Sequence, residues 1–223
     1  MKLCVGYKNY SSWSLRPWIA MKVKGIAFEE LFFPFYHDDS LNQFAAEHKT
    51  PAQVPQLIVG EQVIWDSLAI MEYLHETYPD QHFWPEDKQL RTLARCAAAE
   101  MHSSFQAIRS ECPMNCRQQR RIEVSKEVQA VLKRLAEIWA LFEQAPNKPA
   151  GEFLVGEFGA VDAMYAPVMW RVRNYGLNVS PAFERWAQAM YALPAMQDWL
   201  AGARTEANTY VLEHYHMGTL LEE

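Results

Sequence analysis

The hydrophobic pattern of the chain changes near residue 80, and this change limits the folds that it can adopt. Before this point, short apolar runs typical of strands alternate with segments of helical spacing. After it, apolar residues recur at the three- and four-residue spacing of amphipathic helices. With 223 residues, the chain is long enough for one large domain or two small ones. We therefore expect a mixed α/β part followed by an all-helical part.

The pattern of the first part predicts the order β-α-β-(α)-β-β-α. Two apolar runs separated by Gly60-Glu61 are typical of a β-hairpin, because a glycine opens the two-residue loop. Gly25 is expected to end the first helix, and Pro79 the last one. Strands are predicted over residues 2–6, 28–35, 56–59 and 62–65, and helices over 14–24 and 67–78.

The segment from Pro79 to Pro85 shows neither the strand nor the helix period, and it indicates a linker. We therefore predict domains over residues 1–80 and 89–223, joined by a linker over 81–88. In the helical part, a basic run is interpreted as the solvated start of a helix. The run consists of Arg117, Arg120, Arg121 and Lys126.

Composition excludes several classes of protein. The chain is 50% hydrophobic and 13% aromatic, which is too apolar for a disordered protein. Its net charge of −6 gives no electrostatic basis for binding nucleic acid or an anionic membrane. The N-terminus does not resemble a signal peptide, and no segment approaches the length of a membrane span, so we expect a cytoplasmic protein. The four cysteines are expected to be reduced thiols and not a metal site.

Three short segments are candidates for a functional site: residues 10–18, 53–57 and 65–70. Each has a simple structural interpretation, because serines cap helices and a proline commonly starts a strand. Their order within one β-α-β-α-β-β-α unit is much more specific than any one of them.

Taken together, the three segments resemble the glutathione transferase family over the whole chain. The stretch Ser11–Ala20 is similar to the serine motif of the zeta class, with Trp13 where that class has cysteine. Val54-Pro55 matches the family's cis-proline element, and Asp66-Ser67 its acidic-serine pair. The resemblance implies a thioredoxin-like α/β domain, an all-α domain, a homodimer and a role in detoxification. It implies glutathione as co-substrate, a small electrophile as partner, and no metal.

The resemblance also assigns roles to residues. Ser11 and Ser12 are the candidate catalytic residues, because a serine hydroxyl can donate a hydrogen bond to a thiolate. Ser14 is expected to cap the first helix. The candidate glutathione-binding residues are Gln53, Val54, Pro55, Asp66 and Ser67.

The pocket for the second substrate is expected between the two domains. Arg171 and Arg173 are interpreted as exposed side chains, with an acidic substrate as the alternative. Asp162 is expected to be structural and to accept a hydrogen bond from the Gly159 N–H at a helix start. The candidate pocket residues are Tyr10, Trp13, Met101, Phe105 and Trp170.

Three functions remain open from the sequence. The leading hypothesis is a glutathione transferase in which Ser11 stabilises the thiolate for attack on a small electrophile. A glutathione-dependent cis–trans isomerase of the maleylacetoacetate isomerase type is the second, although Trp13 reshapes the site beside the sulfur. A non-catalytic binding or regulatory protein of the same fold is the third.

Overall fold

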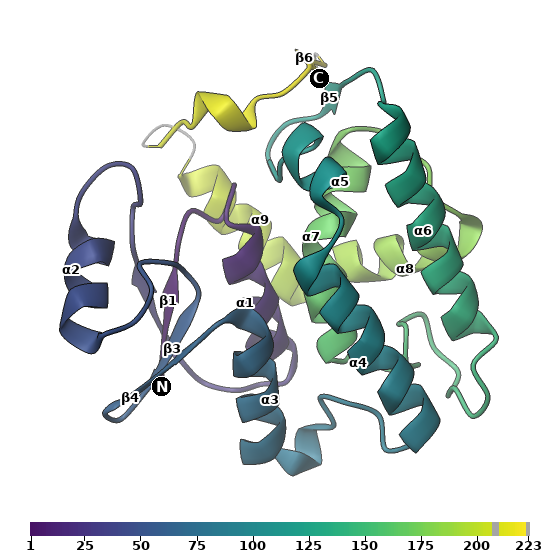
Figure 1. Ribbon diagram of the computed structural model, residues 1–223, viewed down its shortest axis with the longest axis horizontal. Helices are drawn as coiled ribbons and strands as arrows, with labels where there is room; N and C mark the ends of the chain where they lie inside the picture. Colours follow the sequence, from purple (N-terminus) through teal and green to yellow (C-terminus); the bar gives the residue numbers. More distant parts are fainter. Residues whose placement is uncertain (207–209, 222–223) are drawn as a thin grey trace.

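The computed structural model describes residues 1–206 and 210–221. The first part of the chain folds into a four-stranded sheet with helices on both faces (Figure 1). Its elements are β1 (Lys2–Val5), α1 (Ser12–Val23), β2 (Glu29–Phe32), α2 (Ser40–His48), β3 (Gln56–Val59), β4 (Gln62–Trp65) and α3 (Ser67–Thr77). All four predicted strands and both predicted helices are therefore confirmed, with shifts of a few residues at their ends.

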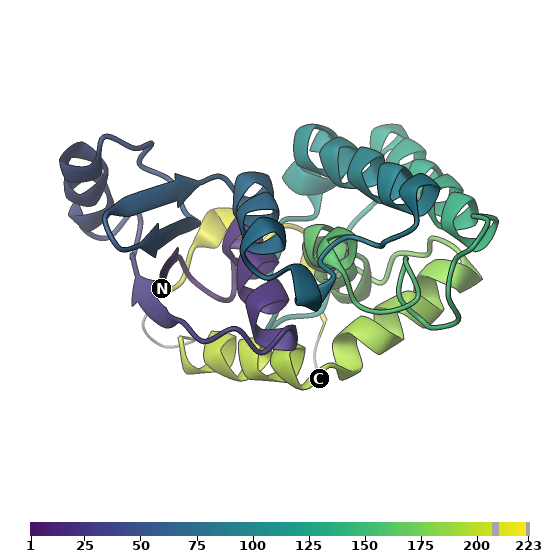
Figure 2. The ribbon, with the colours of Figure 1, turned by 90° about the horizontal axis from the view of Figure 1, so that it is seen from below.

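The sheet has the strand order β2-β1-β3-β4, in which β1 pairs parallel to β2 and antiparallel to β3. The predicted hairpin is present, with Val59 opposite Gln62 at its turn. Helices α1 and α3 cover the face that looks toward the rest of the molecule, whereas α2 covers the other face (Figure 2). Cys4 and Leu41 are part of the small apolar cluster beneath α2.

The second part of the chain is helical around the buried helix α7. Two of its longer helices, α4 and α6, show the predicted amphipathic spacing. Helix α7 itself carries apolar side chains on almost all sides and is buried, as expected for a central helix. The elements are η1 (Pro79–Gln81), α4 (Lys88–Ser103), α5 (Gln106–Glu111), β5 (Arg120–Arg121), α6 (Lys126–Glu143), α7 (Ala160–Asn174), α8 (Pro181–Ala192), α9 (Pro194–Thr205), η2 (Glu213–Tyr215) and β6 (Thr219–Leu220).

This part is not purely helical, because β5 and β6 form a short antiparallel pair. Two-residue strands leave no periodic pattern, and this pair depends on contacts between segments nearly 100 positions apart. The interpretation of the basic run as a helix start is wrong for its first three residues. Helix α6 begins only at Lys126, where the Ser125 hydroxyl accepts a hydrogen bond from the Val128 N–H. Arg120 is buried in the contact between β5 and the C-terminal segment.

The two parts share one hydrophobic core. Helix α1 packs against α7 and α9, and the ring of Trp18 lies 5.0 Å from that of Trp199. Phe83 and Trp84, within the predicted linker, are buried in the same core. The division of the chain into domains stays a prediction, but the linker segment packs against both parts.

Candidate functional site

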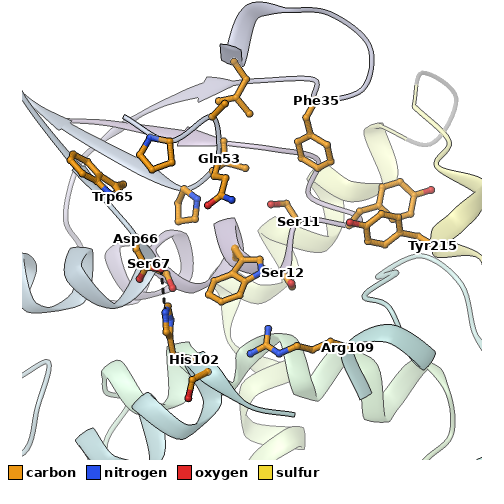
Figure 3. A pocket seen from close by; sticks show the side chains of 18 of the residues that line it. Ser11, Ser12, Phe35, Gln53, Trp65, Asp66, Ser67, His102, Arg109 and Tyr215 are labelled. Atoms are coloured by element: carbon orange, nitrogen blue, oxygen red, sulfur yellow. Dashed lines mark ion pairs between the residues drawn. The ribbon is translucent and has the colours of Figure 1, made fainter. Parts of the chain in front are cut away.

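A cavity of about 630 Å³ lies between the sheet part and the helical part (Figure 3). One wall, which we call the sheet-side wall, consists of residues from the loops after β1, β2, α2 and β4 and from the adjoining ends of α1, α2, β4 and α3. The opposite wall, the helix-side wall, comes from α4, the α4–α5 connection, α5, α7 and the C-terminal segment. The sheet-side wall contains Tyr10, Ser11, Ser12, Trp13, Phe35, Tyr36, Leu41, Pro51, Ala52, Gln53, Val54, Pro55, Trp65, Asp66 and Ser67. The helix-side wall contains His102, Ser103, Ser104, Gln106, Arg109, Arg171 and Tyr215.

The serines of the first motif lie at the start of α1. Ser11 and Ser12 line the cavity, and each is 7% exposed. Ser14 does not cap the helix, because α1 begins at Ser12 and the Ser14 side chain is completely buried. The Ser14 hydroxyl instead accepts a hydrogen bond from the Gly6 N–H at 3.1 Å and lies 2.7 Å from the Ser11 hydroxyl.

The loop before β3 forms the next section of the sheet-side wall. The Val54–Pro55 peptide bond is cis, as expected from the sequence, and the Trp65–Asp66 bond is also cis. The buried Gln56 side chain donates hydrogen bonds to the carbonyls of Pro51 and Gln53, at 2.8 and 2.9 Å. These two bonds hold the loop, which leaves the Gln53 side chain extended into the cavity (Figure 3).

Asp66 and Ser67 lie at the N-terminus of α3. The Asp66 carboxylate accepts a hydrogen bond from the Leu68 N–H at 2.8 Å, so it caps the helix as a simple structural interpretation predicts. Its other oxygen lies 3.4 Å from Nε2 of His102, across the cavity (Figure 3). The buried Ser67 hydroxyl accepts a hydrogen bond from the Arg16 guanidinium at 3.3 Å.

Arg16 brings a positive charge to the buried side of this wall. Its guanidinium is completely buried and lies 4.1 Å from the centre of the Trp13 ring. Burial lowers the pKa of Arg16 to about 9, and the nearby charges of Arg109 and Arg171 add to this effect. A buried cation without an ionic partner is unfavourable. An anion in the cavity would therefore offset both the burial of Arg16 and its repulsion by the other two arginines.

Two arginines line the helix-side wall. Arg171 is 5% exposed, so the expectation of an exposed side chain is wrong. Its guanidinium donates to the carbonyls of Arg109 and Cys112, at 3.2 and 2.6 Å, and burial lowers its pKa to about 10. Arg109 donates to the Ser104 carbonyl at 3.0 Å and lies over the Trp13 ring. Arg173, in contrast, is exposed as expected.

Of the five predicted residues of the second-substrate pocket, Tyr10 and Trp13 line the cavity and three do not. Met101 and Phe105 face the helical core instead, because the helix-side wall is formed by the neighbouring residues of α4 and α5. Trp170 is buried next to the ring of Tyr191 and lines a different cavity.

Sequence reasoning gave no role to six residues of the helix-side wall: His102, Ser103, Ser104, Gln106, Arg109 and Tyr215. A usable signal existed only for Arg171. It lies in a helix that is apolar almost all round, and most positions of such a helix are buried.

The C-terminal strap, residues Tyr210–Leu221, borders the cavity through Tyr215. Tyr215 lines the cavity, and Leu212 packs against Tyr10. The Tyr10 hydroxyl lies 3.0 Å from Nε2 of His216 and accepts a hydrogen bond from Arg117 at 3.1 Å. These contacts hold the strap against Tyr10, the residue that precedes Ser11.

Other expectations concern the rest of the molecule. Asp162 is completely buried and accepts the Gly159 N–H at 2.9 Å, which confirms its structural role. All four cysteines are free, and burial raises the pKa of Cys4 and Cys112 to about 12. Within residues 1–206 and 210–221, no group of three metal-ligating side chains is present. No helix in these ranges has the length and apolar character needed to cross a membrane.

Comparison with known proteins identifies the family. Residues 10–77 match the model of the glutathione S-transferase N-terminal domain. A zeta-class glutathione S-transferase of Euphorbia esula is 30% identical over 84% of this chain and 85% of its own. Maleylacetoacetate isomerase of Rattus norvegicus is 27% identical over 86% of this chain and 88% of its own. The fold is similar to that of a Burkholderia glutathione transferase homolog with bound glutathione, with a TM-score of 0.67, 22% identity, and coverage of 92% and 97%. The chain belongs to the glutathione S-transferase family.

Proposed function

We propose that the cavity binds glutathione along its sheet-side wall and presents the thiolate to a small electrophile at its helix-side wall. One observation carries this proposal. The cavity is lined by Ser11, Ser12 and Ser67 together with Val54, although these residues come from three segments that are far apart in the sequence. Arg109 and Arg171 line the same cavity, and the buried Arg16 lies behind Ser67. Such a site favours an extended, anionic peptide.

Ser11 is the proposed donor to the sulfur. A thiol has a pKa near 8.5, so only about 3% of it is thiolate at pH 7. A hydroxyl hydrogen bond to the thiolate contributes about 1.5–3 kcal/mol, which lowers this pKa by roughly one to two units. The N-terminus of α1 adds a smaller contribution of the same sign. Ser11 therefore acts as a stabiliser of the anion and not as a general base.

The remaining residues hold the peptide. The N-terminus of α3, where the Ser67 hydroxyl meets Arg16, suits the γ-glutamyl carboxylate, since free N–H groups and a cation converge there. The Val54 backbone is the proposed partner of the cysteinyl unit, next to Gln53 and Pro55. Asp66 is the acidic group available to the γ-glutamyl ammonium, a role in which it would exchange its contact with His102.

The test combines binding with activity. Purified protein should be retained on immobilised glutathione and should conjugate glutathione to a neutral aromatic electrophile. Replacement Ser11→Ala should lower the rate at pH 6.5 by about ten- to a hundredfold and move the pH–rate profile to higher pH. Ser12→Ala distinguishes between the two candidate serines and should have a much smaller effect. The matched control is Ser110→Ala, an exposed serine outside the cavity, which should keep the wild-type profile. If calorimetry detects no binding at millimolar glutathione, a non-catalytic binding protein becomes the better interpretation.

A second function, glutathione-dependent cis–trans isomerisation, is favoured by Arg109 and Arg171. Two guanidiniums on the helix-side wall suit a substrate with carboxylates. Relatives named maleylacetoacetate isomerase add to this interpretation. Turnover of maleylacetoacetate without consumption of glutathione would establish the isomerase, whereas loss of the free thiol would establish the transferase.

We further propose that the protein is a cytoplasmic homodimer in which residues 1–80 and 89–223 form separate domains. Support comes from the family and from the four free cysteines, which suit a reducing compartment. Sedimentation equilibrium tests the dimer, and fractionation of cells tests the location.

A further inference from the structure

A second serine lies directly behind the proposed sulfur ligand. Ser14 is completely buried one turn into α1, and its hydroxyl oxygen is 2.7 Å from that of Ser11. The Gly6 N–H, at the end of β1, donates to the same Ser14 oxygen at 3.1 Å. In the part of the chain that the structure describes, Ser14 has no other side-chain hydrogen bond. The three groups thus form a short chain that ends at the cavity.

The number of hydrogens decides the direction of this chain. Each serine hydroxyl has one hydrogen and two lone pairs, and it rotates to suit its partners. If Ser11 donated to Ser14, the Ser14 hydrogen would have no acceptor in a fully buried place, which is unfavourable. If Ser14 donates to Ser11, the Gly6 N–H, the Ser14 hydroxyl and the Ser11 oxygen are all satisfied. The only hydrogen left over is that of Ser11, which lines the cavity.

This arrangement distinguishes Ser11 from its neighbour. Ser12 lines the same cavity, but no side-chain hydrogen bond fixes its hydroxyl among the described residues. Donors that act in series also polarise one another, so each strengthens the next. A thiolate beside Ser11 would lie at the end of a row of donors that begins at a backbone amide.

We propose that Ser14 is a positioning residue that turns the Ser11 hydroxyl hydrogen into the cavity, onto the sulfur of glutathione. This inference rests on the proposed function, since it requires glutathione in the cavity. Ser14 does not touch the ligand and acts only through Ser11. It also identifies which of the two cavity serines is the sulfur ligand.

The test is a pH titration of glutathione bound to the protein, followed by the ultraviolet absorbance of the thiolate. Replacement Ser14→Ala should raise the pKa of the bound thiol by about 0.5–1 unit, equal to a three- to tenfold loss of thiolate at pH values below the pKa. Binding of S-methylglutathione, which has no thiol proton, should change by less than about twofold, because Ser14 does not contact the ligand. The matched control is Ser110→Ala, an exposed serine whose hydroxyl donates to the Gln106 carbonyl. It should leave both values unchanged.

A double variant tests whether Ser14 acts through Ser11. The pKa in Ser11→Ala/Ser14→Ala should equal that in Ser11→Ala alone, because no hydroxyl remains to be oriented. Ser14→Cys, which is slightly larger and keeps a polar hydrogen that donates only weakly, should give a shift between wild type and Ser14→Ala. Ser14→Cys also replaces Ser14→Ala in the test if the unpaired Gly6 N–H prevents Ser14→Ala from folding.

Three results would overturn the inference. An unchanged thiol pKa in Ser14→Ala and Ser14→Cys would leave Ser14 with a structural role only. Additive shifts in the double variant would mean that Ser14 acts independently of Ser11. Failure of the wild-type protein to bind S-methylglutathione would overturn the proposed function together with this inference, whereas the first two results leave the proposed function intact.

Discussion

The two walls of the cavity are built in different ways. The sheet-side wall uses residues at the ends of neighbouring strands and helices, so β1, β3 and α3 fix it through regular hydrogen bonds. The helix-side wall collects residues from α4, α5, α7 and the strap, which are joined by arginine side chains. The sheet-side wall suits a ligand that is the same in every reaction, such as glutathione. The helix-side wall suits substrates that differ from one another, because the shape of this wall depends on a few side-chain contacts that can change independently.

The largest expected effect comes from releasing the strap. Arg120 donates to the carbonyls of His216, Met217 and Gly218, at 3.0, 2.7 and 2.8 Å, and to the Gln118 side chain. With about 0.5–1.5 kcal/mol for each bond, Arg120→Ala should cost the strap about 3 kcal/mol. Hydrogen exchange should then show roughly a hundredfold loss of protection in the strap.

The sheet-side wall should not respond to this change. Arg120→Ala should alter glutathione affinity by less than about twofold, because none of the proposed glutathione ligands lies in the strap. The matched control is Arg121→Ala, since Arg121 is the exposed neighbour in β5. An equal loss of glutathione affinity and of strap protection would mean that the two walls are not separable.

The next effect is on the sheet-side wall itself. Ser67→Ala should weaken glutathione binding by about 2 kcal/mol, or roughly thirtyfold, because a hydrogen bond to a charged group is lost. Titration calorimetry measures this directly. Ser103→Ala changes the same chemical group on the helix-side wall and should have little effect on glutathione. A larger effect in Ser103→Ala than in Ser67→Ala would mean that glutathione binds the helix-side wall, which contradicts the proposal.

A smaller effect is expected on the helix-side wall. Arg109→Gln should raise KM about fivefold for an electrophile with a carboxylate, since a partly exposed ionic contact is worth about 1 kcal/mol. KM for a neutral electrophile of similar size should stay the same. Equal changes for both electrophiles would show that Arg109 shapes the cavity and does not recognise charge.

The smallest effect concerns pH and the strap. Burial lowers the pKa of His216 below its usual value near 6.5, and the charges of Arg120 and Arg117 act in the same direction against Glu213. Within the folded strap the imidazole therefore binds fewer protons than in a released strap. The contribution of neutral His216 to the stability of the folded strap is therefore present above pH 6.5. It is lost as the pH falls through the lowered pKa that His216 has in the folded strap.

Hydrogen exchange of the strap between pH 7.5 and 5.5, corrected for the intrinsic rates, measures this effect. Protection in the wild type should fall by about twofold more than in His216→Gln, which cannot titrate. The same pH dependence in both proteins would contradict a role for the imidazole.

Part of the sheet-side wall was predictable because it depends on local rules. The hairpin at Gly60-Glu61 and the cap at Asp66 each follow from a few adjacent residues, whereas the cis bond before Pro55 was expected from the family resemblance. Even on this wall, the expected role of Ser14 as a helix cap is wrong. Its partner Gly6 lies on a different element, and no pattern within α1 reveals that contact.

The helix-side wall was not predictable in the same way. Met101, in α4, and Phe105, in the α4–α5 connection, are apolar residues near the cavity, but both are buried in the core. Arg120 looks like a surface residue in the sequence and is buried only because the strap returns nearly 100 positions later. Contacts of this kind depend on tertiary packing, which local periodicity does not contain.

A crystal structure of the protein with glutathione bound tests the division between the two walls most directly. We expect the sulfur within about 3.5 Å of the Ser11 hydroxyl, as for a hydrogen bond to a large anion. The peptide should run along Val54 with its γ-glutamyl carboxylate at Ser67, and Arg109 and Arg171 should face open volume. Glutathione bound across the helix-side wall, with its sulfur away from Ser11, would contradict both the division and the proposed mechanism.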